Sequence, residues 1–228
     1  MANLEKEDWD KQWREGWRTQ EDYWNSSYAF KRIREEIKRR LRKKRIKICE
    51  FGAGGGLWLK WLKEEFHAEV YGVDNSKEGL KIAKRRVPTA ILKLGDVKKV
   101  PFKSNYFDFV YGLGLIEHFN DKDIQKIINE SYRTLKKSGI CIITVPNRSK
   151  WSGLWIWEGI FGRTKSERII EPEELEGFFK KAGFKKIGVF PGGLFVPKLR
   201  NKRWFSRLNL KFLENFKTSD YILGFGIK

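Results

Sequence analysis

Cysteine, histidine and methionine are scarce in this chain. Its 228 residues include two cysteines, two histidines and one methionine. Cys49 and Cys141 both stand inside apolar runs, which indicates buried thiols and argues against a disulfide framework. No group of His, Cys, Asp and Glu residues has the spacing of metal ligands, so we expect no metal site.

Long apolar runs are also missing. None approaches the roughly 20 residues that a membrane-spanning helix needs. The N-terminus opens with charged and aromatic residues, unlike a signal peptide. We therefore expect a soluble, cytoplasmic protein. Glutamine is rare while Lys, Arg and Glu are abundant, and this bias is typical of thermophilic proteins.

Basic residues are present in excess. The chain has 48 Lys and Arg against 29 Asp and Glu, which gives a net charge of +19. Such a charge favours an anionic partner, whether nucleic acid, anionic lipid or a phosphorylated metabolite. With 40% hydrophobic residues, the chain can bury one substantial core and a small cap.

The N-terminal region differs in composition from the rest of the chain. Residues 1–27 are rich in Trp and charge, and apolar residues then recur at helical spacing up to Leu41. We predict that residues 1–44 form an aromatic and basic helical cap. Residues 45–228 then form the main domain.

Short apolar runs alternate with helical patterns along the main domain. The pattern predicts five strands, at 45–51, 68–74, 90–94, 107–112 and 140–145, and helices at 56–66, 77–86 and 123–137. A helix opening near Pro172 and strands at 184–190 and 221–227 complete the chain, with irregular insertions at 147–170 and 191–219. We therefore predict an α/β, Rossmann-like, doubly wound sheet of seven mostly parallel strands, with helices on both faces.

A glycine-rich loop follows the first predicted strand. Gly52, Gly54 and Gly56 alternate with other residues just after Glu50. Bare backbone between a strand and a helix suits a nucleotide cofactor. The spacing is not the G-x-G-x-x-G of dinucleotide sites, and the Glu50 carboxylate would repel a phosphate and attract a cation.

In this loop the sequence resembles the class I S-adenosylmethionine-dependent methyltransferases, near their type 11 branch. The first motif of that family reads acid-x-Gly-x-Gly-x-Gly. Four further matches follow in order, namely "VYGVDNS", "LGDVKKVPF", "NYFDFVYGLGLIEHF" and "SYRTLKKSGICIITVPN". The resemblance covers residues 45 to 190, departs mildly at Ser138, and implies S-adenosylmethionine as the cofactor.

The resemblance also implies a set of cofactor-binding residues. Asp74 would accept hydrogen bonds from the ribose hydroxyls, Asp96 would take the adenine amino group, and the Val97 amide would read the ring. The full expected set is Glu50, Gly52, Ala53, Gly54, Gly56, Asp74, Asn75, Asp96, Val97, Gly112 and Leu113.

His118 is the candidate catalytic residue. The loop that carries it faces the cofactor's methyl group in related folds, and a base would help if the acceptor were a hydroxyl or a phenol. A capping or packing role for His118 stays open. His67 lies before the second strand, on the opposite edge of the sheet, and is expected to be structural.

The acceptor is open among three interpretations. The leading one is a small-molecule, apolar or aromatic or lipid-like substrate, with the Trp-rich cap and insertions lining a pocket or touching an anionic membrane surface. The second is an RNA methyltransferase that grips nucleic acid with basic and aromatic residues, although "GLGL" after the fourth strand is not an N-P-P-Y-like motif. The third is a non-catalytic cofactor-binding or assembly protein. The Trp residues could also simply pack the cap, and the oligomeric state is open.

Overall fold

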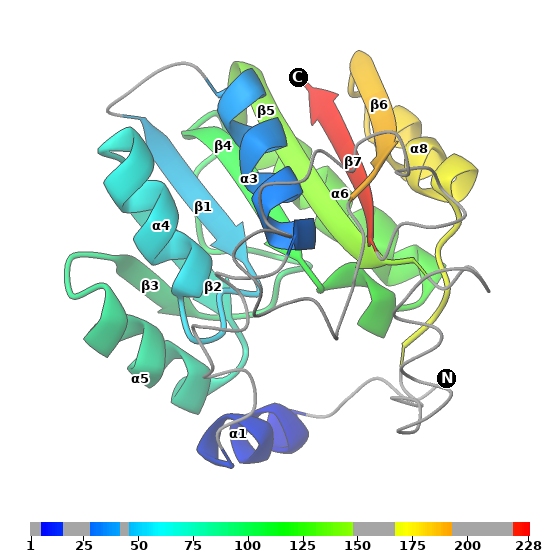
Figure 1. Cartoon of the computed structure of the whole chain (residues 1–228). Coiled ribbons are helices and arrows are strands. Elements are labelled where there is room, and N and C mark those ends of the chain that lie inside the picture. The colour runs from blue at the N-terminus through cyan, green and yellow to red at the C-terminus, as the bar shows by residue number, and fades with distance from the viewer. Residues whose placement is uncertain (1–5, 16–27, 42–45, 148–166, 193–220) are drawn as a thin grey trace.

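The computed structural model describes residues 6–15, 28–41, 46–147, 167–192 and 221–228. Its elements follow one another in a regular alternation after two N-terminal helices (Figure 1). In chain order they are α1 (Lys6–Arg14), α3 (Tyr28–Arg40), β1 (Lys47–Phe51), α4 (Leu57–Phe66), β2 (Glu69–Asp74), α5 (Lys77–Arg86), β3 (Ile91–Leu94), β4 (Phe107–Leu113), the 3₁₀ turn η1 (Ile116–His118), α6 (Asp121–Thr134), β5 (Leu135–Pro146), α8 (Pro172–Lys181), β6 (Lys186–Pro191) and β7 (Tyr221–Ile227).

The strands form one seven-stranded sheet in the order β3-β2-β1-β4-β5-β7-β6. β1 pairs in parallel with β2 and β4, whereas β7 runs antiparallel between β5 and β6. The predicted fold class is therefore confirmed. The strand order reverses at β1 and β4, and in open sheets of this kind ligands bind outside the carboxyl ends of the strands at such a point.

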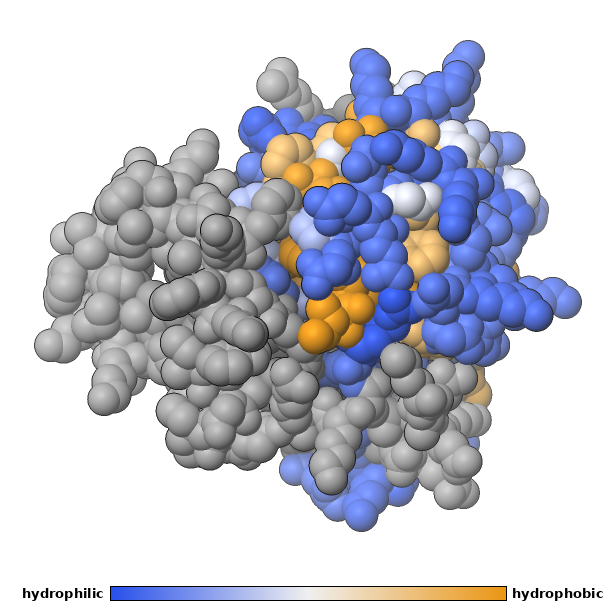
Figure 2. Space-filling view, turned by 90° about the vertical axis from the view of Figure 1, so that its right-hand side faces the viewer, coloured by the Kyte–Doolittle hydropathy of each residue, from blue (hydrophilic) through white to orange (hydrophobic). Residues whose placement is uncertain are grey.

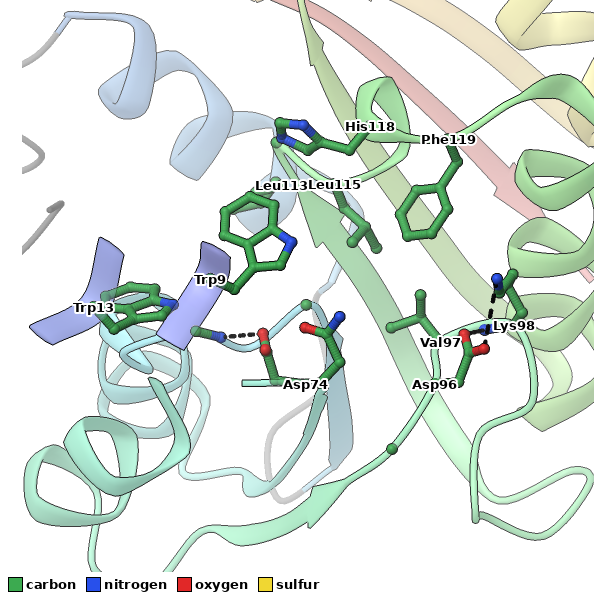
Figure 3. A pocket seen from close by; sticks show the side chains of 15 residues that line it. Trp9, Trp13, Asp74, Asp96, Val97, Lys98, Leu113, Leu115, His118 and Phe119 are labelled. Carbon is green, nitrogen blue, oxygen red and sulfur yellow. Dashed lines mark hydrogen bonds and ion pairs between the residues drawn. The ribbon is translucent and has the colours of Figure 1, made fainter. Parts of the chain in front are cut away.

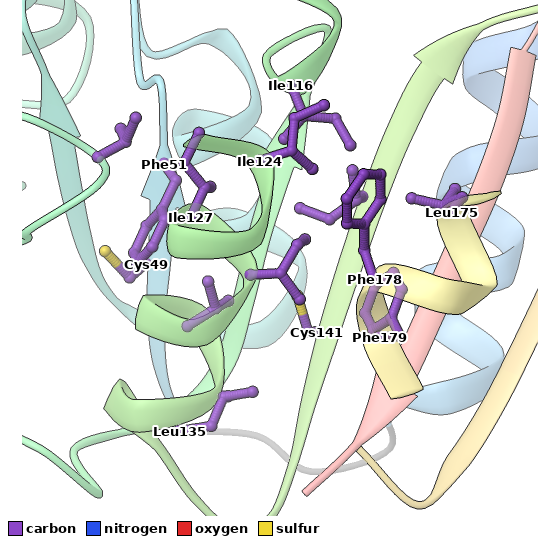
Figure 4. Packing of buried hydrophobic residues seen from close by; sticks show 14 of the residues in the cluster. Cys49, Phe51, Ile116, Ile124, Ile127, Leu135, Cys141, Leu175, Phe178 and Phe179 are labelled. Atoms are coloured by element: carbon purple, nitrogen blue, oxygen red, sulfur yellow. The ribbon is translucent and has the colours of Figure 1, made fainter. Parts of the chain in front are cut away.

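One face of the sheet is covered by α6 and α8. Figure 4 shows Ile124 and Ile127 of α6, and Phe178 and Phe179 of α8, reaching down to the strands. Each of the two isoleucines is fully buried. This amphipathic packing buries a continuous apolar layer, which is the main stabilising term of the fold.

The opposite face is covered by α3, α4 and α5. Ile33 and Ile37 of α3 are 1% and 0% exposed and belong to the same buried cluster as Leu59 and Leu62 of α4. α3 therefore packs as part of the helical layer. In contrast, α1 lies beyond the edge of the sheet, near α5 (Figure 1). The two helices of the predicted cap thus have different positions, and the boundary at residue 44 stays a prediction.

The boundary between α6 and β5 differs from the prediction. The helix was expected to run to Lys137, but it ends at Thr134 and the strand begins at Leu135. Lys136 makes two hydrogen bonds of 2.9 Å with the Asp108 carboxylate at the start of β4. Ser138 has a φ of +64° and donates its N–H to the Lys228 carbonyl. These contacts between distant segments extend the strand and are invisible to periodicity.

Both predicted insertions fall mainly on 148–166 and 193–220, outside the described residues. Their described flanks lie at one edge of the sheet, because Pro146 pairs with Tyr221 and Pro191 with Ile222. That edge is the carboxyl edge of the parallel strands. Figure 2 shows the side of the molecule that carries β6 and α8, where hydrophobic residues reach the surface among hydrophilic ones.

Both cysteines lie in the interior of the protein. Cys49 and Cys141 are free and fully buried, as predicted. Within the described ranges, no helix has the length and apolar character needed to cross a membrane.

Candidate functional site

A cavity of about 250 Å³ opens at the carboxyl ends of β1, β2 and β4, at the switch point of the sheet (Figure 3). The glycine loop, the ends of β2 and β4 and the first helix contribute to its walls. The lining residues are Trp9, Trp13, Gly52, Gly54, Asp74, Asn75, Gly95, Asp96, Val97, Lys98, Leu113, Gly114, Leu115, His118 and Phe119.

The glycine loop after β1 adopts a conformation that other residues resist. Gly52, Gly54 and Gly56 have φ values of +72°, +44° and +68°. The N–H groups of Gly52 and Ala53 both donate to the Val73 carbonyl, at 2.9 and 3.1 Å. The loop is therefore fixed against the end of β2, and Gly52 and Gly54 line the cavity.

Asp74 is the acid at the end of β2. It is 8% exposed, and its two carboxylate oxygens accept hydrogen bonds from the N–H groups of Gly54 at 2.8 Å and Ser76 at 2.7 Å. Burial raises the pKa of Asp74, while these two backbone donors partly offset the rise. Each oxygen keeps a second lone pair, so the carboxylate can still accept hydrogen bonds from a ligand diol.

Glu50 lies one layer deeper, at 4% exposure. It stands opposite Tyr111 in the register of β1 and β4. Burial raises the pKa of Glu50 well above its usual range, and the Tyr111 hydroxyl offsets part of that effect. Within the described ranges Glu50 Oε2 accepts no hydrogen bond. A buried carboxylate oxygen without a donor suits a cationic group of a ligand.

The third predicted segment lies on the far wall of the cavity. Asp96 is exposed, and its carboxylate accepts a hydrogen bond from the Lys98 N–H at 2.8 Å (Figure 3). The Lys98 ammonium lies 3.6 Å from Asp96 and 3.5 Å from Asp123. Val97 is buried beside them. This wall therefore offers a carboxylate edge and a backbone amide, the two groups an adenine ring can use.

His118 lines the cavity from the loop that follows β4. It is 7% exposed in the turn η1, and its ring contacts that of Trp9 edge to face, with 5.0 Å between ring centroids and an angle of 88°. Leu115 and Phe119 continue the apolar wall on the same loop (Figure 3). The imidazole therefore contacts an aromatic ring and shares its loop with two apolar lining residues.

Most predicted site residues line the cavity. These are Gly52, Gly54, Asp74, Asn75, Asp96, Val97, Leu113 and His118. Glu50, Ala53, Gly56 and Gly112 lie behind this lining, and the roles given to all twelve residues stay predictions. In the described part of the chain no three His, Cys, Asp or Glu side chains gather as metal ligands, and the absence of a metal site likewise stays a prediction.

Several lining residues were absent from the predicted set. Gly95 directly follows β3 and Gly114 directly follows β4. Leu115 and Phe119 belong to the motif segment that contains His118. Their place after strand ends was a usable signal. Lys98 belongs to the segment "LGDVKKVPF", but its ion pair with Asp123 of α6 could not be predicted from that segment. Trp9 and Trp13 were expected in a cap, without assigned positions.

Comparison with known proteins points the same way. Residues 49–143 match the family model described as a methyltransferase domain. A ubiquinone biosynthesis O-methyltransferase of Pelagibacter ubique is 31% identical over 149 residues, which cover 60% of this chain and 61% of that protein. An uncharacterized protein of Methanocaldococcus jannaschii is 31% identical over 173 residues, covering 73% of this chain and 78% of its own length. The chain thus matches less than two thirds of the first of these relatives.

A similar fold occurs in a phosphoethanolamine N-methyltransferase of Haemonchus contortus, solved with phosphomonomethylethanolamine and S-adenosylhomocysteine. The TM-score is 0.66 at 20% identity, covering 99% of this chain and 60% of that one. Three features of the site fit the cofactor of such enzymes. They are the cavity at the switch point of the sheet, the loop whose glycines have positive φ values, and the buried acids beside it. The chain belongs to the class I S-adenosylmethionine-dependent methyltransferases, and S-adenosylmethionine is its cofactor.

Proposed function

We propose that this chain transfers the methyl group of S-adenosylmethionine to a small apolar, aromatic or lipid-like acceptor. The observation that carries the proposal is the division of the cavity into two halves. Asp74 and Asp96 make one half polar, whereas Trp9, Leu115 and Phe119 make the other half apolar. His118 belongs to the apolar half, where its ring contacts that of Trp9.

The polar half suits the cofactor. Asp74 would hold the ribose hydroxyls, and Asp96 with the Val97 amide would hold the adenine edge. Glu50 lies behind the glycine loop and would attract the cationic amino group. When bound, the cofactor supplies a methyl group that a sulfonium centre has already activated.

The apolar half suits a flat or aliphatic acceptor. Its aromatic residues exclude water and restrict the orientation of the acceptor, and alignment of this kind contributes several kcal/mol to such a reaction. His118 is within the same wall and could accept a proton at a ring nitrogen from a hydroxyl or phenol acceptor. General base catalysis of that type contributes about 10²- to 10⁴-fold in rate.

The relatives support an acceptor of low molecular mass. The Pelagibacter protein is named for O-methylation in ubiquinone biosynthesis, and the Haemonchus enzyme for N-methylation of phosphoethanolamine. The two names differ in the acceptor atom, so they leave the choice between oxygen and nitrogen to experiment. They share a small molecule as the substrate.

The test is transfer of radiolabelled methyl from S-adenosylmethionine into a host-cell extract, followed by partition between an organic phase and an aqueous phase that contains RNA. We expect label in the organic phase, and loss of that label in an Asp74→Ala variant. RNase-sensitive label in the aqueous phase would support an RNA acceptor and refute the proposal. Cofactor binding without transfer to either phase would favour a non-catalytic protein.

A second measurement tests the role of His118. His118→Gln keeps a polar side chain of similar size but removes the base. We expect kcat to fall by about 10²-fold or more while KM for the cofactor stays nearly unchanged. An unchanged kcat would assign His118 to packing against Trp9.

A further inference from the structure

We infer that helix α1 covers the cofactor site and docks on the glycine loop and on α5. Trp13 and Asp10 are its positioning residues. Trp9 is a specificity-determining residue on the acceptor side of the cavity. The inference rests on the proposed function, because it assigns to α1 a movement that opens and closes the site of methyl transfer. It involves Gly79, which lies outside the methyltransferase motifs, and Gly55, which occupies a position of the first motif where any residue is allowed.

The first observation is a socket for the Trp13 indole. Gly54 and Gly55 of the cofactor loop and Gly79 in the first turn of α5 all face this ring. A Cβ at Gly55 or Gly79 would lie 2.9 Å from an atom of Trp13, and a Cβ at Gly54 would collide with it outright. Three glycines from two elements therefore leave room for one side chain of a third element.

Gly79 is informative because glycine is otherwise unfavourable there. Inside a helix, glycine costs roughly 0.5–1 kcal/mol relative to alanine. Gly79 has no positive φ that would require it. The close approach of Trp13 is a sufficient physical reason for the absence of a side chain.

The second observation is a pair of hydrogen bonds between Asp10 of α1 and the start of α5, next to the Trp13 socket. Asp10 Oδ1 accepts hydrogen bonds from the Ser76 hydroxyl at 2.5 Å and from the Glu78 N–H at 3.1 Å. Ser76 is the N-cap of α5 and also accepts from the Gly79 N–H. Asp10 thus places a negative charge at the N-terminus of α5, where the helix dipole favours it.

Asp10 and the predicted ribose-binding residue Asp74 both accept hydrogen bonds from Ser76. The Asp74 carboxylate accepts from both Gly54 N–H and Ser76 N–H. Gly54 is part of the socket for Trp13, and Ser76 donates to Asp10. Any ligand that orders Asp74 also orders both attachment points of α1, so cofactor binding and docking of α1 should reinforce each other.

Docking of α1 also shapes the acceptor side. Trp9 lies one turn before Trp13 on the same helix and sets its ring against His118 at 5.0 Å. With α1 docked, the cavity measures about 250 Å³, below the roughly 300–1,000 Å³ of typical small-molecule sites. We therefore expect α1 to lift for ligand entry and to complete the acceptor wall when it returns.

The experiment is hydrogen exchange of the α1 amides in the full chain, without and with S-adenosylhomocysteine. We expect the ligand to slow exchange in the wild-type protein. Gly79→Ala and Trp13→Ala should each accelerate exchange about tenfold or more and weaken binding of S-adenosylhomocysteine. In the Trp13→Ala background, Gly79→Ala should have a smaller effect, because the ring is gone and only the Gly54 backbone carbon, 3.3 Å from the added Cβ, remains close.

The matched control is Gly177→Ala, since Gly177 lies in α8 and a Cβ added there would meet open space. That variant should leave α1 exchange and ligand affinity unchanged. Asp10→Asn keeps an acceptor oxygen for Ser76 and Glu78 and should retain slow exchange better than Asp10→Ala. Such a rescue would not be expected if position 10 affected only general stability.

Two results would overturn the inference. One is fast exchange of α1 in the wild-type protein with and without ligand, and the other is equal affinity for S-adenosylhomocysteine in wild type and Trp13→Ala. Failure of the wild-type protein to bind S-adenosylhomocysteine would instead contradict the proposed function. Docking of α1 would still be judged from exchange in the ligand-free variants.

Discussion

The Asp74 carboxylate accepts a hydrogen bond of 2.8 Å from the Gly54 N–H, and this bond ties the end of β2 to the glycine loop that follows β1. The two residues are 20 positions apart in sequence. One buried acid therefore shapes the loop and also faces the cavity. Substitutions at Asp74 should affect ligand binding through both roles.

Asp74→Asn should weaken binding of S-adenosylhomocysteine by roughly 10- to 100-fold. Both carboxylate oxygens accept from backbone N–H groups, so an amide must turn its own NH₂ toward one of those donors. Loss of a charged hydrogen bond costs about 1.5–3 kcal/mol. Calorimetric titration measures the affinity. Asp108→Asn, at the start of β4, is the control, and equal affinities for both variants would contradict the site assignment.

Glu50→Gln should stabilise the ligand-free protein at pH 8 while it weakens cofactor binding. The folded protein raises the pKa of Glu50, so it favours the neutral carboxyl. The stability from this group is fully present below the pKa of the unfolded chain, about 4.3, and is lost as pH rises through the higher folded pKa. A glutamine stays neutral and avoids that loss.

We expect Glu50→Gln to raise the free energy of unfolding by about 1 kcal/mol or more at pH 8 and to change it little at pH 4. Denaturant titrations at both pH values measure the effect. The exposed Glu171→Gln variant is titrated in parallel as the control. A destabilised Glu50→Gln protein at pH 8 would indicate that the carboxylate is held by interactions with the protein alone.

Gly56→Ala should destabilise the fold by about 2 kcal/mol or more. Gly56 has a φ of +68°, which costs other residues roughly 1–2 kcal/mol. Its Cβ would also lie 2.8 Å from the Cβ of Ala83 on α5. Adding Ala83→Gly should remove the 2.8 Å contact and leave the backbone strain and the 3.0 Å contact with the Cα at position 83. A double-mutant cycle by chemical denaturation separates the two effects, and additive changes would show that the contact contributes nothing.

The two thiols should be inert in the native protein. Burial raises the pKa of Cys141 to about 12 and raises the pKa of Cys49, so neither forms an appreciable fraction of reactive thiolate at pH 8. A disulfide reagent should label less than one thiol per chain under native conditions and two in denaturant. Rapid labelling of the native protein would show that one strand opens locally.

The sequence predicted the sheet well because each strand is encoded locally. Apolar runs such as that of β1 end in an acid and glycines, so the strand, its end and the ligand loop can be read from a few neighbouring residues. The predicted boundary between α6 and β5 was wrong, because the real one depends on two long-range hydrogen bonds. Lys136 donates to Asp108, and the Ser138 N–H donates to the Lys228 carbonyl. No local pattern contains those contacts.

Some residues of the site could also be predicted from local sequence, whereas others are positioned by contacts between distant segments. Asp74, the glycines of the loop and His118 could be placed from motif order, since parallel strands bring their carboxyl ends to one edge. By itself the sequence determined the family, the cofactor and that edge. The tertiary structure decided which side chains close over it: Asp10 meets Ser76 across 66 positions, and Trp13 enters a socket whose glycines come from two other elements. Such contacts follow from the packing of distant segments, and hydrophobic periodicity does not encode them.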